Sequence, residues 1–554
     1  MQISGAEIIV KCLIEEGVDT VFGYPGGAII PFYDKLREET RINHILTAHE
    51  QGASHAADGY ARATGEIGVC VATSGPGATN LVTGLATAFL DSVPLLAITG
   101  QVSKSMIGTD AFQEVDITGI TIPITKHNFL VKNVEELAHT LRLAIQIAKE
   151  GRPGPVLVDI PRDVQMAMTE YRVEKLPELK SEQPNLLKVE RATDAINNAK
   201  RPVMLIGGGV INSNCEYKAM ELAEKLEMPV VSTLMGIGPC SAYRRICLGM
   251  SGMHGHEKSN QAVKESDLIL AIGSRFNDRL TDNKATYGEH KTIIHIDIDP
   301  AELDKNIYSS IGISGDARLT LDALINRCEK KNLKKWWSLI DSWKSWEEDA
   351  GDEEAPKFFR ALNPVLKGKK YIIATDVGQH QMWAAQNIKI EFARQFLTSG
   401  GLGTMGFGLP AAMGAQFSKP DSRVISISGD GGFKMTGSEL FTIASYGVPV
   451  IAIVFNNSGL GMIRQLQKVF LEERYTACEL PGYVDFVKYG EAFGISGVKV
   501  DTPEDLAKTI EKYLAEENPQ PHVIEVTLNP KDMVQPMVIA GRGLNQFVKF
   551  DKNK

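Results

Sequence analysis

The segment from residue 424 to residue 465 constrains the fold more than any other part of the chain. It contains two short apolar runs rich in β-branched residues, Val424 to Ser428 and Val448 to Phe455, a pattern typical of buried strands in a parallel sheet. Between them we expect a turn over residues 429–432 and a helix over residues 435–444. Because parallel neighbours need a crossover connection, usually a helix, this segment predicts an α/β fold built on parallel sheets.

Each predicted strand is followed by an oxygen-bearing side chain, Asp430 after the first and Asn457 after the second. The carboxyl ends of parallel strands meet at one sheet edge, where α/β folds bind ligands. Such oxygens suit Mg²⁺, which keeps part of its shell for phosphate and water, and Gly429 and Gly431 let a diphosphate approach the backbone. Gly-Asp-Gly alone favours a simpler interpretation, an ordinary turn, but its combination with Asn456-Asn457 is far more specific.

Composition limits the class of protein. A chain of 554 residues with 43% hydrophobic residues is expected to form several domains with well-formed cores. A net charge of −9 without a long basic run argues against nucleic acid or a membrane surface as the main partner. Seven cysteines without a Cys-x-x-Cys pair favour free thiols, and the most apolar region, 67–98, is interrupted by Gly75-Pro76-Gly77. We therefore expect a cytoplasmic protein.

The alternation of apolar runs and helical patterns predicts three α/β domains, each with a mostly parallel sheet flanked by helices. We expect an N-terminal domain at 1–165, a charged linker at 166–190, a central domain at 191–348 and a C-terminal domain at 356–554. The acidic run at 347–354 would be a solvated boundary. The rhythm of the first and third domains suggests a shared sheet topology.

Further segments reinforce the Gly-Asp-Gly and Asn-Asn pair, among them HEQGASHAADGYAR at 49–62, whose small residues predict close helix packing. Together they resemble acetohydroxyacid synthase, also called acetolactate synthase, in its biosynthetic, FAD-containing form, a family of thiamine-diphosphate enzymes. The resemblance covers essentially the whole chain, because the matching segments fall in all three predicted domains. The others are YPGGA (24–28), TSGPGATNL (73–81), MIGTDAFQE (106–114), KHNF (126–129), GMHG (252–255) and SGGLGTMGFGLPAA (399–412).

The resemblance implies a transferase that condenses pyruvate with pyruvate or 2-oxobutyrate and releases CO₂. The products would be 2-acetolactate or 2-aceto-2-hydroxybutyrate, intermediates of branched-chain amino-acid biosynthesis. Thiamine diphosphate, Mg²⁺ and FAD are the implied cofactors, with no net redox role for the flavin. The implied assembly is a homodimer or tetramer with active sites at the chain interface, and a small regulatory subunit is a possible partner.

The resemblance also assigns roles to residues. Glu50 would contact N1′ of the aminopyrimidine and activate the cofactor; an isolated Glu at a helix start would instead be a capping interaction. Arg279 would recognise the acceptor carboxylate, for which a planar guanidinium is suited. The remaining implied site residues are Gly27 and Gln113 at the reacting centre, Pro76, Asn80, Gly378, Gln379, His380, Met405, Gly429 and Gly431 for thiamine diphosphate, and Asp430, Asn457 and the Gly459 carbonyl for Mg²⁺.

The central domain would bind FAD, although its triple glycine alone could be no more than a tight turn. The implied FAD residues are Arg152, Gly207, Gly208, Gly209, Leu234, Met235, His254, Arg275, Asp297, Ile298 and Asp316.

The substrate channel would be lined by Phe112, Arg162, Met462 and Leu466, and here the sequence departs from the family. Leu466 occupies a position where most members carry a tryptophan that favours 2-oxobutyrate as acceptor. We therefore expect an acceptor preference shifted toward pyruvate and weak binding of planar herbicides. Ser103, Arg162 and Asn277 replace a common proline, lysine and aspartate.

Three alternatives stay open at this point. The chain could be a pyruvate oxidase type that passes electrons to its flavin, a flavin-free catabolic acetolactate synthase, or an inactive regulatory subunit. The MIGTDAFQE and GMHG segments favour the synthase over the oxidase. The FAD-type central domain argues against the flavin-free enzyme, and intact Glu50, Asp430 and Asn457 argue against the inactive subunit.

Overall fold

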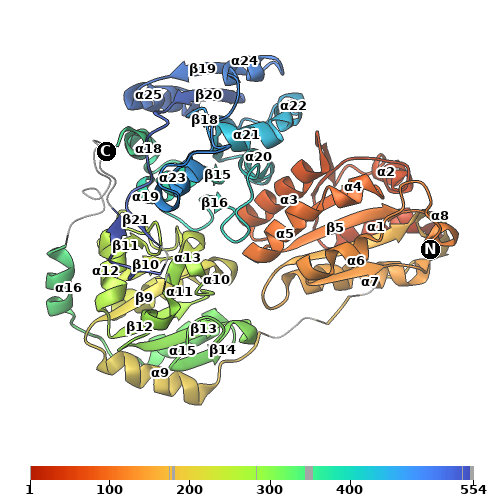
Figure 1. The fold of residues 1–554 in the computed structure, drawn as a ribbon. Coiled ribbons are helices and arrows are strands. Elements are labelled where there is room, and N and C mark those ends of the chain that lie inside the picture. The colour runs from red at the N-terminus through yellow and green to blue at the C-terminus, as the bar shows by residue number, and fades with distance from the viewer. Residues whose placement is uncertain are drawn as a thin grey trace.

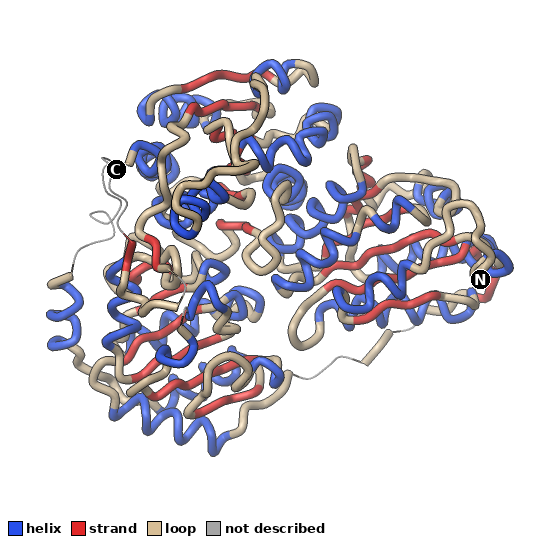
Figure 2. The backbone as a smooth tube through the Cα atoms, viewed as in Figure 1, coloured by secondary structure: helices blue, strands red, loops and turns tan. Residues whose placement is uncertain are grey.

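The computed structural model describes residues 2–173, 175–177, 181–281, 283–343, 353–539 and 541–548. It confirms an α/β fold with three six-stranded parallel sheets, each flanked by helices (Figures 1 and 2). The first sheet uses strands within residues 20–161, the second within 202–314 and the third within 371–527. None of the described helices is both long and apolar enough to cross a membrane.

The first sheet has the strand order β3-β2-β4-β5-β7-β6, and all its neighbours are parallel. Alternate residues of β4 enter different apolar clusters, Cys70 on one face and Val69 and Val71 on the other, so both faces are covered. The strands are β2 (Thr20–Gly23), β3 (Asn43–Leu46), β4 (Gly68–Ala72), β5 (Leu95–Gln101), β6 (His127–Leu130) and β7 (Pro155–Pro161), with β1 (Gln2–Ser4) and β8 (Met168–Glu170) paired separately. The helices are α1 (Gly5–Glu15), α2 (Ile30–Leu36), α3 (Glu50–Thr64), α4 (Pro76–Thr79), α5 (Val82–Asp91), η1 (Lys104–Met106), α6 (Ile117–Thr121), η2 (Ile122–Ile124), α7 (Val134–Lys149) and α8 (Arg162–Met166).

The third sheet has the order β16-β15-β17-β18-β20-β19, which is the order of the first sheet when strands are counted from the start of each. The suggested shared topology is confirmed. Its strands are β15 (Tyr371–Thr375), β16 (Phe396–Thr398), β17 (Arg423–Gly429), β18 (Ile451–Asn456), β19 (Ser496–Val500) and β20 (His522–Thr527). Its helices are α18 (Glu354–Leu366), α19 (Gln379–Asn387), α20 (Gly408–Ser418), α21 (Asp430–Thr436), η5 (Gly437–Glu439), α22 (Leu440–Ser445), α23 (Gly461–Phe470), α24 (Phe486–Glu491) and α25 (Pro503–Leu514), and the short strands β21 (Met537–Val538) and β22 (Phe547–Val548) follow.

The second sheet has a different order, β11-β10-β9-β12-β13-β14. Its strands are β9 (Pro202–Ile206), β10 (Val230–Ser232), β11 (Cys247–Met250), β12 (Leu268–Ile272), β13 (Thr292–Asp297) and β14 (Ile311–Ser314). Its helices are α9 (Leu186–Asn198), α10 (Gly208–Asn212), α11 (Glu216–Lys225), η3 (Leu234–Gly236), α12 (Glu257–Glu265), α13 (Asp278–Thr281), α14 (Lys284–Tyr287), η4 (Pro300–Glu302), α15 (Ala317–Arg327) and α16 (Lys334–Asp341).

The first and third domains pack through α3 and α20, and residues of both contribute to one apolar cluster. A Cβ at Gly59 would lie 2.1 Å from the carbonyl oxygen of Ala411, and one at Gly414 would lie 1.8 Å from that of Ala56. Only glycine allows this approach, which accounts for the small residues of the 49–62 segment.

The structure corrects the expectation for residues 429–432. They are not a turn: α21 begins at Asp430, and the helix expected over 435–444 is divided among α21, η5 and α22. Asp430 accepts a hydrogen bond from the Gly431 N–H at 2.9 Å, and a Cβ at Gly432 would lie 2.3 Å from Oδ1 of Asp376. Glycine at position 432 therefore serves close packing rather than a turn conformation.

The boundary before the central domain contains more regular structure than expected. The predicted linker includes β8, and α9 begins at Leu186, before its end. Residues 344–352, and with them most of the acidic run, lie outside the described residues.

Candidate active site and cofactor cavity

Each of the three sheets has a point where neighbouring strands connect onward in opposite directions, and ligands of α/β folds bind in the crevice outside the carboxyl ends at such a point. In the third sheet this point lies between β15 and β17, which lead into Gly378 and Asp430. In the second it lies between β9 and β12, which lead into residues 207–209 and 273–275. In the first it lies between β2 and β4, followed by residues 24–27 and 73–76. Several candidate site residues thus lie where this topology predicts ligands, among them Gly27, Pro76, Gly378 and Asp430.

The candidate metal residues lie together at the third sheet. The Asp430 carboxylate accepts hydrogen bonds from the N–H of Gly431 at 2.9 Å and of Gly459 at 3.0 Å. Asn457 donates from Nδ2 to Oε1 of Gln379 at 3.3 Å. Burial raises the pKa of Asp430 to about 6, and a divalent cation beside it would favour the charged form.

The donor set fits Mg²⁺, because a carboxylate, an amide oxygen and a backbone carbonyl are all hard oxygen ligands. No group of three or more His, Cys, Asp and Glu side chains in the described part of the chain is arranged to hold a metal. The amide of Asn457 and the carbonyl of Gly459 would therefore be needed to complete a site around Asp430.

His380 follows the same sheet edge at the start of α19. It is buried, and its Nε2 finds no hydrogen-bond partner among the described residues. A Cβ at Gly429 would lie 2.9 Å from its Nδ1, so the ring lies against the glycine loop. Burial lowers the pKa of His380 to about 3 and keeps the ring neutral. An orphaned buried nitrogen beside a glycine loop fits an oxygen-rich ligand such as a diphosphate.

A second group of candidates lies at the first sheet. Glu50 is the first residue of α3 and is half-buried; its Oε2 accepts a hydrogen bond from Nδ2 of Asn80 at 2.9 Å. A Cβ at Gly77, next to Pro76, would lie 3.3 Å from its Oε1. Gly27 is exposed, with open space where a Cβ would lie. The structure therefore brings the Glu50, Pro76 and Asn80 candidates together.

The loop between β5 and α6 carries Gln113 with a φ of 60°. Its backbone lies against Gly75, where a Cβ would be 2.8 Å from the Gln113 carbonyl oxygen. Phe112 beside it is 86% exposed, and Arg162 at the start of α8 is also exposed.

A cavity of about 1590 Å³, larger than most small-molecule sites, is lined by residues of all three domains. All candidate FAD residues except Gly207 line this cavity. A Cβ at Gly207 would lie 2.0 Å from the carbonyl oxygen of Gly273, so Gly207 packs against the backbone of the neighbouring loop. Arg279, Met462 and Leu466 also line it, so the cavity extends from the FAD candidates to three of the acceptor and channel candidates. The lining FAD candidates are Arg152, Gly208, Gly209, Leu234, Met235, His254, Arg275, Asp297, Ile298 and Asp316.

The cavity wall combines charges with orphaned polar atoms. Arg152 pairs with Glu302 at 2.7 Å and with Asp299 at 3.3 Å. Nε2 of His254 and Oγ of Ser274 are buried without a partner among the described residues. Burial and, second to it, the charge of Arg279 lower the pKa of His254 to about 4. A large cavity with unsatisfied polar groups fits a dinucleotide.

Glu50 and Asp430 are not among the residues that line this cavity. The thiamine and flavin candidates therefore occupy separate places in one chain. Sequence reasoning missed several lining residues that come from outside the motifs, including Asp91, Ser92, Val377 and Gln381. Asp91 alone gave a signal, because it is a carboxylate at the end of the otherwise uncharged helix α5.

Comparison with known proteins gives matches along nearly the whole chain. The sequence matches "Thiamine pyrophosphate enzyme, N-terminal TPP binding domain" over residues 3–120, "central domain" over 189–324 and "C-terminal TPP binding domain" over 376–526. It is 45% identical to the "Probable acetolactate synthase large subunit" of Methanocaldococcus jannaschii, over 98% of this chain and 95% of that protein. The chain belongs to the acetolactate synthase large-subunit family. The "Acetolactate synthase large subunit" of Haemophilus influenzae is 41% identical over 99% of this chain and 98% of that protein. "Acetolactate synthase isozyme 3 large subunit" of Escherichia coli K12 is 40% identical over 98% of both chains.

Membership in the acetolactate synthase family confirms the resemblance found in the sequence motifs. The two matches named as thiamine pyrophosphate binding include most strands of the two sheets that share a topology, and they include Glu50 and Asp430. The match named as the central domain covers the glycines at 207–209 and most of the cavity residues of the second sheet.

Proposed function

We propose that the chain condenses pyruvate with a second pyruvate or with 2-oxobutyrate, releases CO₂ and forms 2-acetolactate or 2-aceto-2-hydroxybutyrate. This is the first common step of branched-chain amino-acid biosynthesis. The observation that carries the proposal is a pair of polar clusters, one at the carboxyl edge of each of the two sheets that share a topology: Glu50 with Asn80, and Asp430 with Asn457 and Gly459. Relatives named acetolactate synthase match over nearly the whole chain.

Thiamine diphosphate, when bound, supplies the electron sink that decarboxylation of a 2-oxoacid requires. Glu50 would hold a proton at N1′ of the aminopyrimidine, and Asn80 keeps the Glu50 carboxylate in place through its 2.9 Å hydrogen bond. The N–H of Gly27 would face the oxyanion that develops on the substrate. Gln113 would line the reacting centre beside it.

Mg²⁺ would be held by Asp430, Asn457 and the Gly459 carbonyl, and the diphosphate by the glycine loop and α19. Met405 would supply an apolar wedge against the cofactor, since its Cε lies 3.4 Å from the position of a Cβ on Gly431. The remaining diphosphate contacts would come from Gly378, Gln379, His380 and Gly429.

FAD would occupy the cavity between the domains. The support is its volume, its orphaned polar groups and the candidate residues that line it. Arg279 is 66% exposed at its side chain and lines the same cavity, where its guanidinium would bind the acceptor carboxylate. The sheets within 20–161, 202–314 and 371–527 support a division into domains at 1–165, 191–348 and 356–554. Seven free thiols support a cytoplasmic location.

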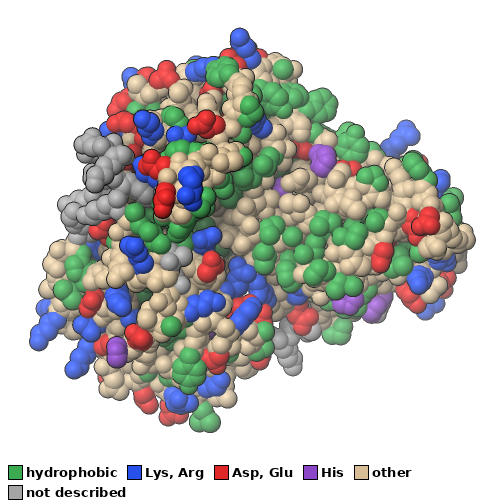
Figure 3. Space-filling model, viewed as in Figure 1, with side chains coloured by type: hydrophobic (Ala, Val, Ile, Leu, Met, Phe, Trp, Pro, Cys, Tyr) green, Lys and Arg blue, Asp and Glu red, His purple; other side chains and the backbone are tan. Residues whose placement is uncertain are grey.

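The complete thiamine site would form between the first domain of one chain and the third domain of another. Large apolar side chains near both candidate edges are exposed, among them Phe112, Ile122, Met435 and Phe441. Figure 3 shows apolar side chains gathered over the first domain. A homodimer would cover such surface, and dimers could pair into tetramers. The relatives named "large subunit" support a small regulatory subunit as a further partner.

The test is a product analysis of the purified chain with pyruvate, thiamine diphosphate, Mg²⁺ and FAD. Acetolactate, detected as acetoin after acid treatment, together with CO₂ is the expected result. Acetate or acetyl phosphate with reduction of an added electron acceptor would instead support the pyruvate oxidase alternative. Acetoin from a preparation that retains no flavin would support the catabolic synthase.

A further inference from the structure

The loop at residues 399–407 lies between the two candidate sites. It connects β16 to α20, and its first part, residues 399–403, lines the cavity. Its later part carries Met405, whose side chain lies toward Gly431. Gly403 and Gly406 have φ values of 72° and 89°, so the backbone turns sharply on both sides of Met405. The position of Met405 therefore depends on whatever fixes this loop.

Two carboxylates from different domains hold the loop at its ends. Asp91, from α5 of the first domain, accepts hydrogen bonds from the Gly401 N–H at 2.7 Å and the Gly400 N–H at 3.1 Å. Asp376, from the third domain, accepts hydrogen bonds from Gly406 at 2.9 Å and Gly408 at 3.0 Å. Of these two carboxylates, only Asp91 comes from outside the loop's own domain.

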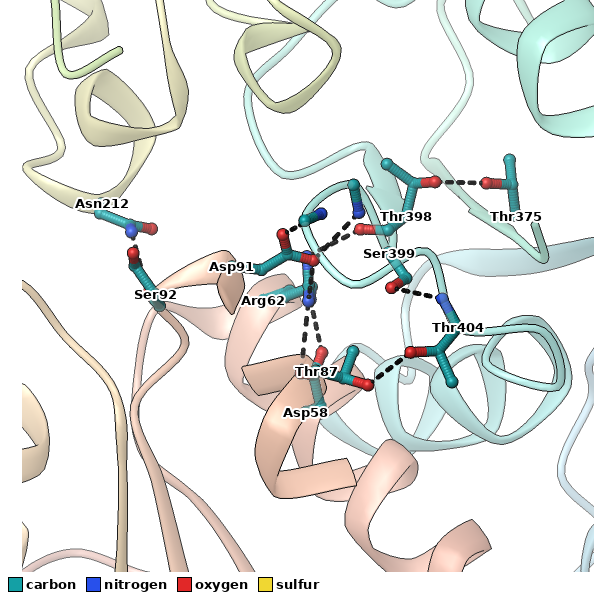
Figure 4. Close-up of polar contacts among 12 residues, drawn as sticks. Asp58, Arg62, Thr87, Asp91, Ser92, Asn212, Thr375, Thr398, Ser399 and Thr404 are labelled. Atoms are coloured by element: carbon teal, nitrogen blue, oxygen red, sulfur yellow. Dashed lines mark hydrogen bonds and ion pairs between the residues drawn. The ribbon is translucent and has the colours of Figure 1, made fainter. Parts of the chain in front are cut away.

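A hydroxyl pair supports the middle of the loop. Oγ1 of Thr404 lies 2.7 Å from Oγ1 of Thr87 on α5 (Figure 4). The backbone N–H of Thr404 donates a hydrogen bond to Oγ of Ser399 at 3.0 Å. Thr87 and Asp91 are one helical turn apart, so they present both anchors on one face of α5.

Arg62 of α3 orients Asp91. Its Nη2 donates to Oδ2 of Asp91 at 2.9 Å, its Nε pairs with Asp58, and its Nη1 donates to the carbonyl oxygen of Thr398 at 2.8 Å. The Arg62 side chain is 8% exposed, and the side chains of both aspartates are fully buried. Two buried carboxylates share one guanidinium, so Asp91 needs further donors, and the N–H groups of Gly400 and Gly401 are those donors. The cluster and the loop are therefore mutually dependent.

We propose that Asp91, oriented by Arg62, is a positioning residue that fixes the loop at residues 399–407 and thereby holds Met405 against the thiamine cofactor. The role given to Met405 rests on the proposed function, whereas the anchoring of the loop does not. The same contacts shape one wall of the cavity, so a single buried cluster supports both candidate sites.

Replacing Asp91 by Asn tests the proposal. The amide keeps the volume but removes the charge, and it offers only one oxygen to three donors. Hydrogen–deuterium exchange on the full chain without cofactors should show amides in 399–407 exchanging about tenfold faster or more, the factor that loss of a charged hydrogen bond gives. Thiamine diphosphate affinity, followed by tryptophan fluorescence with Mg²⁺, should fall by a similar factor.

Asp267 provides a matched control, because it also accepts two consecutive backbone N–H groups, those of Lys200 at 2.8 Å and Arg201 at 2.9 Å. Asp267→Asn should leave exchange in 399–407 unchanged. Thr87→Val is a milder second variant in case Asp91→Asn does not fold, and Thr87→Ser should restore the wild-type exchange. The serine hydroxyl can again form the hydrogen bond with Oγ1 of Thr404.

Unchanged exchange in 399–407 in both Asp91→Asn and Thr87→Val would overturn the anchoring. Faster exchange with unchanged thiamine diphosphate affinity would overturn the link to Met405. Failure of the wild-type chain to bind thiamine diphosphate would contradict the proposed function and the link to Met405, and the exchange data would still decide the anchoring.

Discussion

At the scale of single residues, the account predicts that Leu466 on the cavity wall affects the choice of acceptor. It lines the cavity beside Met462, on α23. Leu466→Trp should raise the ratio of 2-aceto-2-hydroxybutyrate to 2-acetolactate when pyruvate and 2-oxobutyrate compete, because a larger aromatic surface favours the acceptor with the extra methylene. One methylene in an apolar pocket changes such a ratio by roughly tenfold or more.

Competition assays with both acceptors measure this ratio. Ile463→Trp, at an exposed position of the same helix that does not line the cavity, is the control and should leave the ratio unchanged. An unchanged ratio in Leu466→Trp itself would exclude a role for this position in acceptor choice.

Asp159, on β7, leads to a prediction about how the free energy of unfolding depends on pH. It accepts hydrogen bonds from Thr99 at 2.7 Å and Gln101 at 2.9 Å; burial, with a smaller effect of Asp116, raises its pKa to about 7. The folded state therefore binds more protons than the unfolded state between the two pKa values, and stability falls as pH rises through that window. Asp159→Asn carries no charge, so its stability relative to wild type should rise by about 3 kcal/mol from pH 5 to pH 8.

Thermal unfolding of both proteins at several pH values measures that difference. A constant offset between them across the range would show that Asp159 titrates below pH 5 in the folded protein.

At the scale of elements, the contact of α3 with α20 depends on glycine. Gly414→Ala should destabilise the first and third domains by about 1–3 kcal/mol or more, because the new methyl group would overlap the Ala56 carbonyl. Denaturant unfolding measures the loss. Gly312→Ala, where the nearest atom would be 3.5 Å away, is the control. Equal stability of the two variants would mean that α3 and α20 can move apart with little loss in the free energy of unfolding.

Sequence patterns predicted the strands well, because buried parallel strands are short apolar runs. They also predicted that Asp430 and Asn457 follow neighbouring strands at one sheet edge, since carboxyl ends of parallel strands share an edge. They placed the start of α21 wrongly, because the glycines at 429–432 were interpreted as turn residues. Gly432 is instead required by close packing against Asp376, which lies more than fifty positions away in the sequence. The anchoring of the 399–407 loop by Asp91 was likewise not predictable, since that contact joins residues about three hundred positions apart.

At the scale of the whole molecule, the account predicts an assembly with at least twice the chain mass of 60.5 kDa. Phe441 on α22 is 54% exposed near the candidate cofactor edge. Phe441→Asp should shift sedimentation toward the monomer and lower thiamine diphosphate affinity together, because each site would need two chains. Tyr217→Asp, at an 81% exposed position on α11, should change neither property. A monomeric wild-type chain that binds the cofactor fully would refute a shared site.

The most direct test of the central claim is acetolactate formation from pyruvate by wild type and Glu50→Gln, each saturated with thiamine diphosphate, Mg²⁺ and FAD. The amide keeps a hydrogen-bonding group opposite Asn80 but has no carboxyl to hold a proton at the aminopyrimidine. The account predicts acetoin after acid treatment from the wild type, and a rate lower by about a hundredfold or more in the variant with cofactor affinity largely retained. Equal rates would contradict it.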